Sequence, residues 1–377
     1  MRNFALETYF SRWEFKARYH LTASDMESLR LSALLEMASP ADRAAYEEVW
    51  LGYTETYGLP ELRAEIAKTY DGLAPEDILC FAGAEEGIYA AMRVMLSAND
   101  HVIVAVPNYQ AAETLPLDIC EVTGVPLDPD DGWSWDIDRV RAALRPNTKL
   151  ISVNFPNNPT GAVLSRDRYD ALIALCRQHG LYLFSDEVYR LIERDPALRL
   201  PQAAESYERA LSLNVMSKAY GLPGLRIGWI ACQDRELLQC LERYKHYLSI
   251  CNSAPSERLA LIALRARDKI LARNRGLTDE NAAKLSAFFA EFPDHFQWER
   301  PEGGCVGFPR YTGPGTADDF CERLVAQAGV LLLPPKIYHS ELLPTPQDRF
   351  RIGYGRRNMD EGLAAFRAYL NSNLQST

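Results

Sequence analysis

One segment of the chain places a lysine, a glycine-rich turn and an arginine directly after an apolar run. The segment is residues 217–226, SKAYGLPGLR, which contains Lys218 and Arg226. A lysine whose pKa is lowered is a nucleophile toward carbonyl carbon, and arginine binds anions through paired hydrogen bonds. Taken alone, a lysine after a strand is more often a solvated surface charge, so the rest of the sequence has to decide between the two interpretations of Lys218.

Other short polar motifs follow apolar runs in the same way. Asn158 belongs to an Asn-Pro-Thr-Gly motif, and Asp186 and Tyr189 follow the next run. Residues 83–86 (GAEE) follow an earlier run and open a helical pattern. Arg351 lies in a Phe-Arg-Ile run near the end of the chain. Each motif is weak by itself, but their shared position at the ends of strands predicts a single site.

The middle of the chain alternates apolar runs with helical patterns. The expected strands are 77–81, 101–106, 149–155, 181–184, 210–216 and 225–231. Runs that are apolar on both faces indicate a mostly parallel sheet covered by helices. Such a sheet binds its ligand at the carboxyl ends of the strands, which is where the motifs lie. We therefore predict an α/β fold with a doubly wound sheet.

The C-terminal third has a different pattern. Helices are expected over 236–264, with an interruption near Pro255, and over 279–292 and 360–370; short strands are expected near 307–308, 330–333 and 350–352. This α+β pattern predicts a large domain over 40–265 and a smaller one formed by 1–39 together with 266–377. The first 35 or so residues should lie against the smaller domain and approach the site from the side.

Length and composition exclude several classes of protein. A chain of 377 residues suggests two or three domains, and 47% hydrophobic with 24% charged residues is typical of a globular protein. No run approaches the ~18 apolar residues of a membrane helix, and the N-terminus has no secretory or transit pattern, which favours a cytoplasmic protein. A net charge of −10 argues against nucleic-acid binding and suits a cationic substrate. The eight cysteines show no CxxC pair or zinc spacing, so we expect reduced thiols and no metal site.

Together the motifs resemble the fold type I, class I/II aminotransferase family of pyridoxal-phosphate enzymes. The resemblance runs from about Tyr53 to the C-terminus and includes SKAYGLPGLRIGW, NFPNNPTG, SDEVY and FRIGYGR. It implies an aspartate-aminotransferase-like fold, pyridoxal 5'-phosphate as the cofactor and an amino acid as the substrate. It also implies a homodimer with shared active sites, because Tyr53 matches a tyrosine that reaches the cofactor phosphate of the neighbouring subunit.

The resemblance implies a role for each matching residue around the cofactor ring. Lys218 would bond to the cofactor as an imine and, once displaced, would move protons at the substrate Cα. Asp186 would keep the pyridine nitrogen protonated, so that the ring draws electrons from a carbanion. Tyr189 and Asn158 would hydrogen-bond the ring oxygen, with Asn158 also beside the substrate, and Tyr109 would stack on the ring. The alternatives are a helix-capping Asp186 and a core Tyr109.

The cofactor phosphate requires cations and main-chain donors. By the same resemblance, Arg226 would bind it bidentately, and the N–H groups of Ala84 and Glu85 at a helix start would form an anion site. Ser217 would add a hydroxyl group. Arg351 would clamp the substrate α-carboxylate through two hydrogen bonds.

The sequence departs from the family pattern in three places. Val215 stands where a serine often precedes the lysine by three residues. Glu85 and Glu86 occupy the stretch where a hydroxylic residue is common, and at least one of them must point away because a carboxylate repels a phosphate. The usual Gly-x-Pro segment near the N-terminus is replaced by 13–15 (WEF) and 24–28 (SDMES). These departures argue against ordinary transamination of common amino acids.

Further segments are similar to a narrower subgroup, the capreomycidine synthases and related hydroxyarginine cyclases. They are 6–10 (LETYF), the Ser24-Asp25 region, 243–249 (RYKHYLS), 303–311 (GGCVGFPRY), 320–324 (FCERL) and 329–331 (GVL). The similarity implies a lyase that acts on a β- or γ-hydroxylated arginine in specialised metabolism. Its product would be a cyclic guanidine amino acid such as capreomycidine or enduracididine.

The chemistry of such a cyclodehydratase indicates which acids matter. Hydroxide is a poor leaving group, so a carboxylic acid of raised pKa has to protonate it before the guanidine closes the ring. Acidic side chains are also best suited to orient a guanidinium. Glu7, Asp25 and Glu27 lie in the atypical N-terminal segment and are candidates for both tasks, with Glu7 chosen as the proton donor. The alternative for each is a solvated carboxylate on a helix face.

Other functions remain open on the sequence. The core motifs equally support an aminotransferase of a cationic amino acid, and an oxygen-dependent arginine oxidase is a further variant. A pyridoxal-phosphate-binding regulator without catalysis is the alternative from a different class. Lys218 and Arg351 argue against it, because a regulator need not retain a carboxylate clamp.

Overall fold

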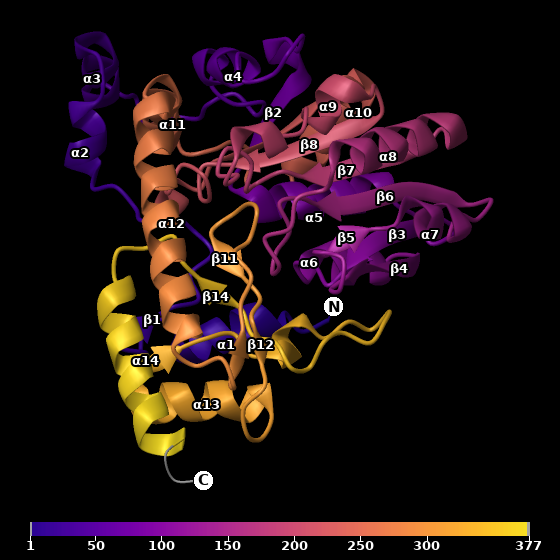
Figure 1. The fold of residues 1–377 in the computed structure, drawn as a ribbon. Coiled ribbons are helices and arrows are strands. Elements are labelled where there is room, and N and C mark those ends of the chain that lie inside the picture. Colours follow the sequence, from indigo (N-terminus) through magenta and orange to yellow (C-terminus); the bar gives the residue numbers. More distant parts are fainter. Residues whose placement is uncertain (1, 375–377) are drawn as a thin grey trace.

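A computed structural model describes residues 2–374 of the chain. Among these residues, eight strands form one sheet in the order β2-β9-β8-β7-β6-β3-β4-β5. They are β2 (Ile78–Phe81), β3 (His101–Val106), β4 (Glu121–Asp128), β5 (Ser134–Trp135), β6 (Thr148–Asn154), β7 (Tyr182–Asp186), β8 (Ala210–Val215) and β9 (Gly228–Cys232). Figure 1 shows this sheet at the upper right, with the C-terminal part of the chain below it and to the left.

Most of the sheet is parallel. The neighbours β3, β4, β6, β7 and β8 pair in parallel, whereas β9 is antiparallel to both β2 and β8, and β5 is antiparallel to β4. Every residue of β2, β3, β8 and β9 is buried, as a sheet between two helical layers requires. Because β2 and β8 both oppose β9, the carboxyl ends of all the main strands except β9 meet at one edge.

Helices cover both faces of this sheet. The helices of this part of the molecule are α2 (Leu31–Glu36), α3 (Pro40–Glu47), α4 (Pro60–Ala67), α5 (Ala84–Met95), α6 (Ala111–Leu117), α7 (Ile137–Ala142), α8 (Arg166–His179), α9 (Ala203–Ser206), α10 (Arg235–Lys245) and α11 (Ala254–Arg265). Of these, α2 and α3 pack against α11 and lie away from the sheet. A Cβ on Gly87 of α5 would contact Leu213 of β8, whereas the adjacent Ser212 accepts a hydrogen bond from the N–H of Ala204 in α9. Since successive strand residues point to opposite faces, α5 and α9 lie on opposite sides of the sheet.

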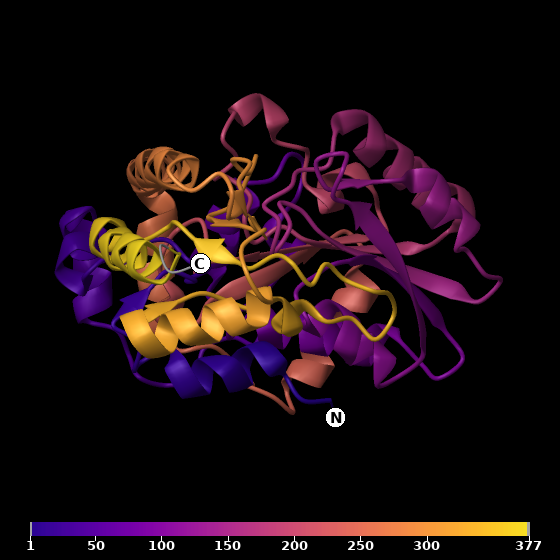
Figure 2. The ribbon, with the colours of Figure 1, turned by 60° about the horizontal axis from the view of Figure 1, so that its bottom comes forward.

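The smaller part of the molecule has its own aromatic core. Its elements are α1 (Ala5–Trp13), β1 (Tyr19–His20), α12 (Arg267–Ala290), β10 (Phe296–Gln297), β11 (Val306–Gly307), β12 (Arg310–Tyr311), α13 (Ala317–Ala328), β13 (Val330–Leu331), β14 (Ile352–Gly353) and α14 (Met359–Leu374). Phe288, Phe320 and Phe366 are buried together in this core. Leu6 and Tyr9 of α1 pack in a cluster with Val325 of α13, and Figure 2 shows α1 in indigo beside α13 in orange.

The structure confirms the predicted α/β class and the six expected strands, with bounds that shift by up to three residues. The sequence analysis missed β4, whose segment contains a glycine and a proline and lies near the sheet edge. It also placed the start of α12 too late, because residues 267–278 are rich in charged side chains and lack a clear apolar stripe. The domain boundaries at 39/40 and 265/266 stay predictions. Within residues 2–374, no helix has the length and apolar character needed to cross a lipid bilayer.

Candidate active site

A cavity of about 520 Å³ lies at the carboxyl ends of β6, β7 and β8. Asn154 and Asp186, the last residues of β6 and β7, line it together with Lys218, which follows β8. Side chains of the N-terminal segment, including Glu7 and Asp25, line the cavity as well. The carboxyl edge of the sheet and the first 25 residues therefore build one site, as the sequence predicts.

Lys218 is held in the cavity by the N-terminal segment. Its Nζ donates a hydrogen bond to Oγ of Ser24 at 2.8 Å and lies 5.8 Å from the centre of the Tyr189 ring. Burial lowers the pKa of Lys218, and the negative charge of Asp25 acts in the opposite direction. A lysine of lowered pKa supplies the neutral amine that attacks a carbonyl carbon.

Asp186 is a buried carboxylate near this lysine. Burial raises its pKa to about 7, while a hydrogen bond from the N–H of Val188, 3.2 Å from Oδ1, acts in the opposite direction. A carboxylate removed from water in this way is strongly stabilised by a cationic partner. A protonated pyridine nitrogen is such a partner, so the environment of Asp186 fits the role that the sequence predicts for it.

Asn158 connects the cavity to a deeper arginine. Its Oδ1 accepts hydrogen bonds from Nη1 of Arg351 and from the hydroxyl of Tyr338, both at 3.1 Å. Arg351 is fully buried, its Nη2 donates to the carbonyl of Thr22 at 2.8 Å, and its Nε has no partner among the described residues. A substrate carboxylate would bind Nη1 of Arg351 at the place where Oδ1 of Asn158 now binds it. The role of Arg351 as the clamp for the substrate carboxylate stays a prediction.

Two tyrosines lie in the cavity wall. The hydroxyl of Tyr189 donates to the carbonyl of Ser24 at 3.1 Å. The hydroxyl of Tyr109 hydrogen-bonds the carboxylate of Glu85, and its ring meets Phe4 edge to face with the ring centres 5.5 Å apart. Burial raises the pKa of both phenols, so both keep their protons at neutral pH.

The start of α5 forms a corner of the cavity built around two glycines. Gly83 has a φ of +97°, and a Cβ there would lie 2.5 Å from Nη2 of Arg226. A Cβ on Gly228 would lie 2.9 Å from the main-chain N of Ala84. The two glycines therefore let a guanidinium and the N–H groups of a helix start come together, and Ser217 also lines the cavity. A cation, a hydroxyl and a helix N-terminus are the groups that bind a phosphate.

The two adjacent glutamates in this stretch point in different directions. Glu86 turns away, because its carboxylate accepts hydrogen bonds from the N–H of Ala82 at 2.5 Å and of Ser249 at 3.1 Å. Glu85 lines the cavity, and its Oε2 is buried without a hydrogen-bond partner among the described residues. Burial raises the pKa of Glu85 to about 7. The sequence predicts that at least one of the two carboxylates points away from the phosphate, and Glu86 does so. Glu85 can remain beside a phosphate when its carboxyl group is neutral.

The N-terminal segment lines one end of the cavity with charged and polar side chains. Glu7 and Glu14 have no ion-pair partner among residues 2–374, and burial together with the charge of Glu7 raises the pKa of Glu14. Asp25, in contrast, accepts two hydrogen bonds from Arg356, at 3.0 and 2.9 Å. His20 lies at the same end, and burial lowers its pKa to about 4, so the ring is neutral. The two uncompensated carboxylates favour a cationic side chain here.

Three of the predicted residues do not line the cavity: Arg351, which lies behind Asn158, and Glu27 and Tyr53. Glu27 does not line it, and its carboxylate accepts a hydrogen bond from the N–H of Arg357 at 3.0 Å. The assignment of Glu27 to the substrate stays a prediction that these contacts do not support. The side chain of Tyr53 is 83% exposed and does not line the cavity of its own chain. Its role at a neighbouring subunit also stays a prediction.

The sequence analysis did not assign several residues that line the cavity. Asn154 accepts a hydrogen bond from the N–H of Asn158 and donates to the carbonyl of Asp186, so it aligns two strand ends. Asn154 begins the NFPNNPTG motif and Arg356 ends FRIGYGR, so both motifs held a usable signal. Glu14 lies in the atypical segment 13–15 (WEF), which was the signal available for it, but only the packing of the N-terminal segment onto the sheet shows that it lines the cavity.

Pyridoxal 5'-phosphate requires an amine for its aldehyde, an anion for its ring nitrogen and donors for its phosphate. Lys218, Asp186 and the corner beside Arg226 satisfy these requirements within one cavity. The fold and the site therefore define a pyridoxal-phosphate-dependent enzyme of the aspartate-aminotransferase-like architecture.

Sequence comparison gives the family. The model of the aminotransferase class I and II family matches residues 21–366, so the chain belongs to this family. The chain is 30% identical over 366 residues to capreomycidine synthase of Streptomyces vinaceus, covering 96% of this chain and 92% of that protein. It is 29% identical over 336 residues to the arginine–pyruvate transaminase AruH of Pseudomonas aeruginosa, covering 84% and 81%.

Solved structures have the same architecture. A pyridoxal-phosphate-dependent aminotransferase from Streptococcus suis 89-1591 superposes with a TM-score of 0.91 at 29% identity, covering 98% of both chains. The pyridoxal-phosphate-dependent cyclase OrfR superposes with a TM-score of 0.89 at 24% identity, covering 99% of this chain and 98% of that one. At that identity the second likeness shows the fold alone.

Proposed function

We propose that this chain is a pyridoxal-phosphate-dependent cyclodehydratase of a hydroxylated arginine. It would eliminate water and close a cyclic guanidine amino acid of the enduracididine or capreomycidine type. The observation that carries the proposal is the acidic end of the cavity, where Glu7 and Glu14 form no ion pair within 4.0 Å among the described residues and share the cavity with Lys218. The 30% identity to capreomycidine synthase along 96% of the chain supports it.

The residues around the cofactor provide the first half of the reaction. Pyridoxal phosphate, when bound, supplies an electron sink for a carbanion at the substrate Cα. Lys218 removes the Cα proton with its amine, and Ser24, which accepts a hydrogen bond from Nζ, orients that amine. Asp186 holds the proton on the ring nitrogen. Arg351 binds the substrate carboxylate, with Nη1 taking the carboxylate in place of Asn158.

The carboxylates of the N-terminal segment provide the second half of the reaction. Glu7 donates a proton to the departing hydroxyl, so that it leaves as water and takes its electron pair with it. A γ-hydroxyl also requires the loss of a Cβ proton before the water leaves. A guanidine nitrogen then forms the new C–N bond and its proton passes to the carboxylate of Glu7, while the protons taken from carbon are returned to carbon, from Lys218 in the case of Cα, so the net change is the loss of one water. Glu14 orients the guanidinium during these steps, whereas Asp25, which lines the same cavity, already binds the guanidinium of Arg356.

A mass measurement tests the proposal. The holoenzyme is incubated with arginine, β-hydroxyarginine and γ-hydroxyarginine, each with and without pyruvate and with dissolved oxygen monitored. We expect one hydroxyarginine to lose 18 mass units, equal to one water, without any 2-oxo acid and without oxygen consumption. Formation of a keto acid that depends on pyruvate, or consumption of oxygen, would overturn the cyclodehydratase assignment.

A second candidate is an aminotransferase of a cationic amino acid. The specific observation in its favour is the 29% identity to an arginine–pyruvate transaminase over 84% of the chain. Its cofactor residues would act in the same way, and the acidic end would hold the arginine side chain. The two candidates differ in whether a 2-oxo acid is consumed, which the same incubation measures. An arginine oxidase is the remaining alternative, and it differs by its need for oxygen.

A further inference from the structure

A second cavity, of about 410 Å³, lies behind the candidate active site. Val188 and Val215 line both cavities, so they form the partition between them. Asn214 lines only the second cavity, and in a strand it points to the face opposite that of Leu213, which contacts α5. The second cavity therefore lies on the α9 side of the sheet, at the carboxyl end of β8.

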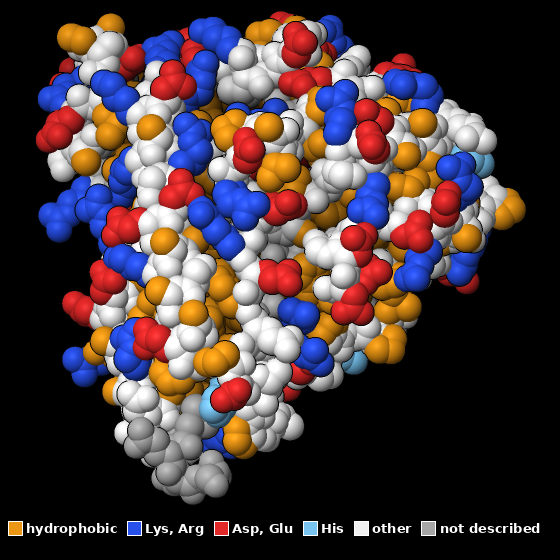
Figure 3. Space-filling view, viewed as in Figure 1, with side chains coloured by type: hydrophobic (Ala, Val, Ile, Leu, Met, Phe, Trp, Pro, Cys, Tyr) orange, Lys and Arg blue, Asp and Glu red, His pale blue; other side chains and the backbone are white. Residues whose placement is uncertain are grey.

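Four arginines line this second cavity, which we call the arginine cavity. Arg190 and Arg199 come from the loop after β7, and Arg267 and Arg275 come from α12. Arg267 and Arg275 are eight residues apart with Leu271 between them, a spacing that places all three on one stripe of a helix. In Figure 3, basic side chains gather near the centre of the face, beside the region where α11 meets α12.

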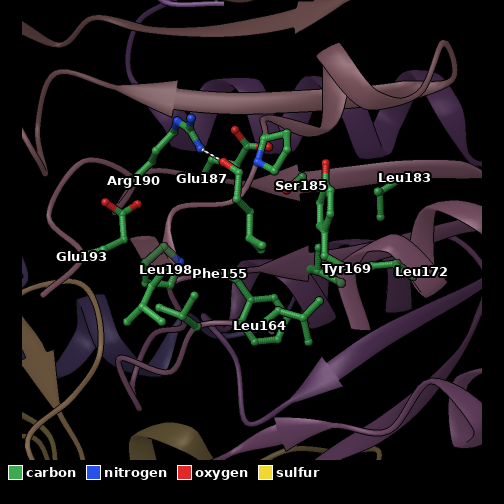
Figure 4. Close-up of a pocket in the computed structure, with 15 residues that line it drawn as sticks. Phe155, Leu164, Tyr169, Leu172, Leu183, Ser185, Glu187, Arg190, Glu193 and Leu198 are labelled. Carbon is green, nitrogen blue, oxygen red and sulfur yellow. Dashed lines mark hydrogen bonds between the residues drawn. The ribbon is translucent and has the colours of Figure 1, made fainter. Parts of the chain in front are cut away.

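Only two of these four arginines form an ion pair with a carboxylate. Arg199 pairs with Glu193 and Arg267 pairs with Glu65, each at 2.9 Å. Arg275 donates to the carbonyl of Leu191 at 3.4 Å. Arg190 donates to a main-chain oxygen as well, that of Leu200, and Figure 4 shows this bond, with Glu193 on the same loop.

The charge in the arginine cavity is therefore compensated only in part. Among residues 2–374, Arg190 and Arg275 have no carboxylate within 4.0 Å, and Nη2 of Arg199 is buried without a hydrogen-bond partner. Asp268 is the one carboxylate that lines this cavity in the described chain. Glu187 lies near Arg190 without forming an ion pair with it: its Oε1 accepts hydrogen bonds from Ala203 and Ser212, whereas its Oε2 is buried with no hydrogen-bond partner among the described residues, and the charges of the two side chains act on each other. Guanidinium groups confined together repel one another, and an anion placed between them removes that repulsion.

The arginine cavity is much larger than a neighbouring small cavity. The small cavity in Figure 4, between β7 and α8, has a volume of about 30 Å³, which corresponds to about one water molecule. The arginine cavity, at about 410 Å³, falls in the range of small-molecule sites. It can enclose a ligand of several heavy atoms as well as a single ion.

We propose that the arginine cavity binds a small dianion, with two carboxylates or one phosphoryl group, held by Arg190 and Arg275. The bidentate geometry of guanidinium suits both kinds of anion. This site is separate from the corner beside Arg226, and it does not depend on which reaction the enzyme catalyses. Because Val188 and Val215 lie close in sequence to Asp186 and Lys218, the anion would be bound directly behind the catalytic residues.

Calorimetry with two probes tests the proposal. Inorganic phosphate and malonate are titrated into the holoenzyme at a constant ionic strength set with sodium chloride; the bound cofactor keeps its own phosphate corner filled. We expect saturable binding of at least one probe with one site per chain. Binding of phosphate alone identifies a phosphoryl ligand, and binding of malonate alone identifies a dicarboxylate. No saturable binding of either probe would overturn the proposal.

Matched variants locate the site. Arg275→Gln should weaken binding at least tenfold, whereas Lys269→Gln removes the same charge from an exposed position of the same helix and should leave binding unchanged. Arg190→Gln provides a second test from the opposite wall if Arg275→Gln folds poorly. Folding is checked by circular dichroism and by the visible absorption of the bound cofactor. Binding to the folded Arg275 and Arg190 variants that equals that of the unsubstituted protein would exclude the arginine cavity as the site.

Discussion

Nζ of Lys218 lies 2.8 Å from Oγ of Ser24, a residue 194 positions earlier in the chain. The hydroxyl of Tyr189 donates to the main-chain oxygen of the same serine. The N-terminal segment therefore does more than cover the cavity, because it contacts the reactive amine and a predicted cofactor ligand. This contact links the part of the sequence that departs from the family pattern to the part that follows it.

Removing the hydroxyl of Ser24 should slow turnover. In Ser24→Ala the amine of Lys218 loses a hydrogen-bond acceptor, and a bond to a charged group contributes about 1.5–3 kcal/mol, so we expect a loss of roughly tenfold in kcat. The pKa of Lys218 should also fall, because its charged form loses a partner. Both are measured by kinetics and by the pH dependence of the cofactor's visible absorption. Ser24→Thr keeps the hydroxyl and serves as the control; equal behaviour of the Ala and Thr variants would contradict this role.

Lys218 should be the point of covalent attachment. Reduction of the holoenzyme with borohydride, followed by peptide mass mapping, should place the cofactor on Lys218, because a nucleophilic amine of lowered pKa lies in the cavity. Lys218→Ala should lose both the label and turnover. Lys269→Ala, at an exposed position, should keep both. A label found on another lysine would refute the assignment.

Replacing Glu7 should separate two stages of the proposed reaction. Glu7→Gln cannot protonate the leaving hydroxyl, so ring closure should fall by at least about 100-fold, the usual contribution of a general acid. Exchange of the Cα proton with deuterated water should continue, because Lys218 is unaffected. Product is measured by mass spectrometry and exchange by proton NMR. Glu47→Gln on α3, exposed and outside the cavity, is the matched control; normal cyclisation by Glu7→Gln would rule out Glu7 as the donor.

Glu85 should make cofactor binding depend on pH. Burial raises its pKa to about 7, so the carboxyl is neutral below that pH and charged above it. A charged carboxylate repels the phosphate, so the affinity of the apoenzyme for pyridoxal phosphate should fall as the pH rises through about 7, by at most about tenfold per pH unit. Glu85→Gln stays neutral and should bind more tightly than the unsubstituted chain above pH 7. Fluorescence titration measures this, and parallel pH profiles for the two proteins would contradict it.

Much of the fold follows from local patterns. Strands such as 101–106 are apolar on both faces, so the sequence alone indicates a buried, mostly parallel sheet. No local pattern in the sequence shows that β9 is antiparallel to its neighbours, because a strand that is buried on both faces has the same apolar pattern in either direction. The edge strands β4 and β5 were missed because an edge does not demand a long apolar run.

The sequence by itself determined which groups are expected to take part in the cofactor chemistry. Lys218, Asp186 and Arg226 lie in short motifs, and each motif's position after a strand is enough to bring them to one edge of the sheet. Only the tertiary structure decided which N-terminal acids line the cavity without an ion-pair partner. Asp25 is paired with Arg356, and Glu27 is turned to the N–H of Arg357, through contacts that span 331 and 330 positions of the chain.

The physical reason is the range of the interactions. A helix face or a strand end depends on neighbours a few residues away, so a local pattern can predict it. Whether a carboxylate is free, paired or buried depends on what the rest of the chain places beside it. Glu7 and Glu14 have no ion-pair partner among the described residues, and neither do Arg190 and Arg275 on the other side of the sheet, because of packing that no motif in the sequence encodes.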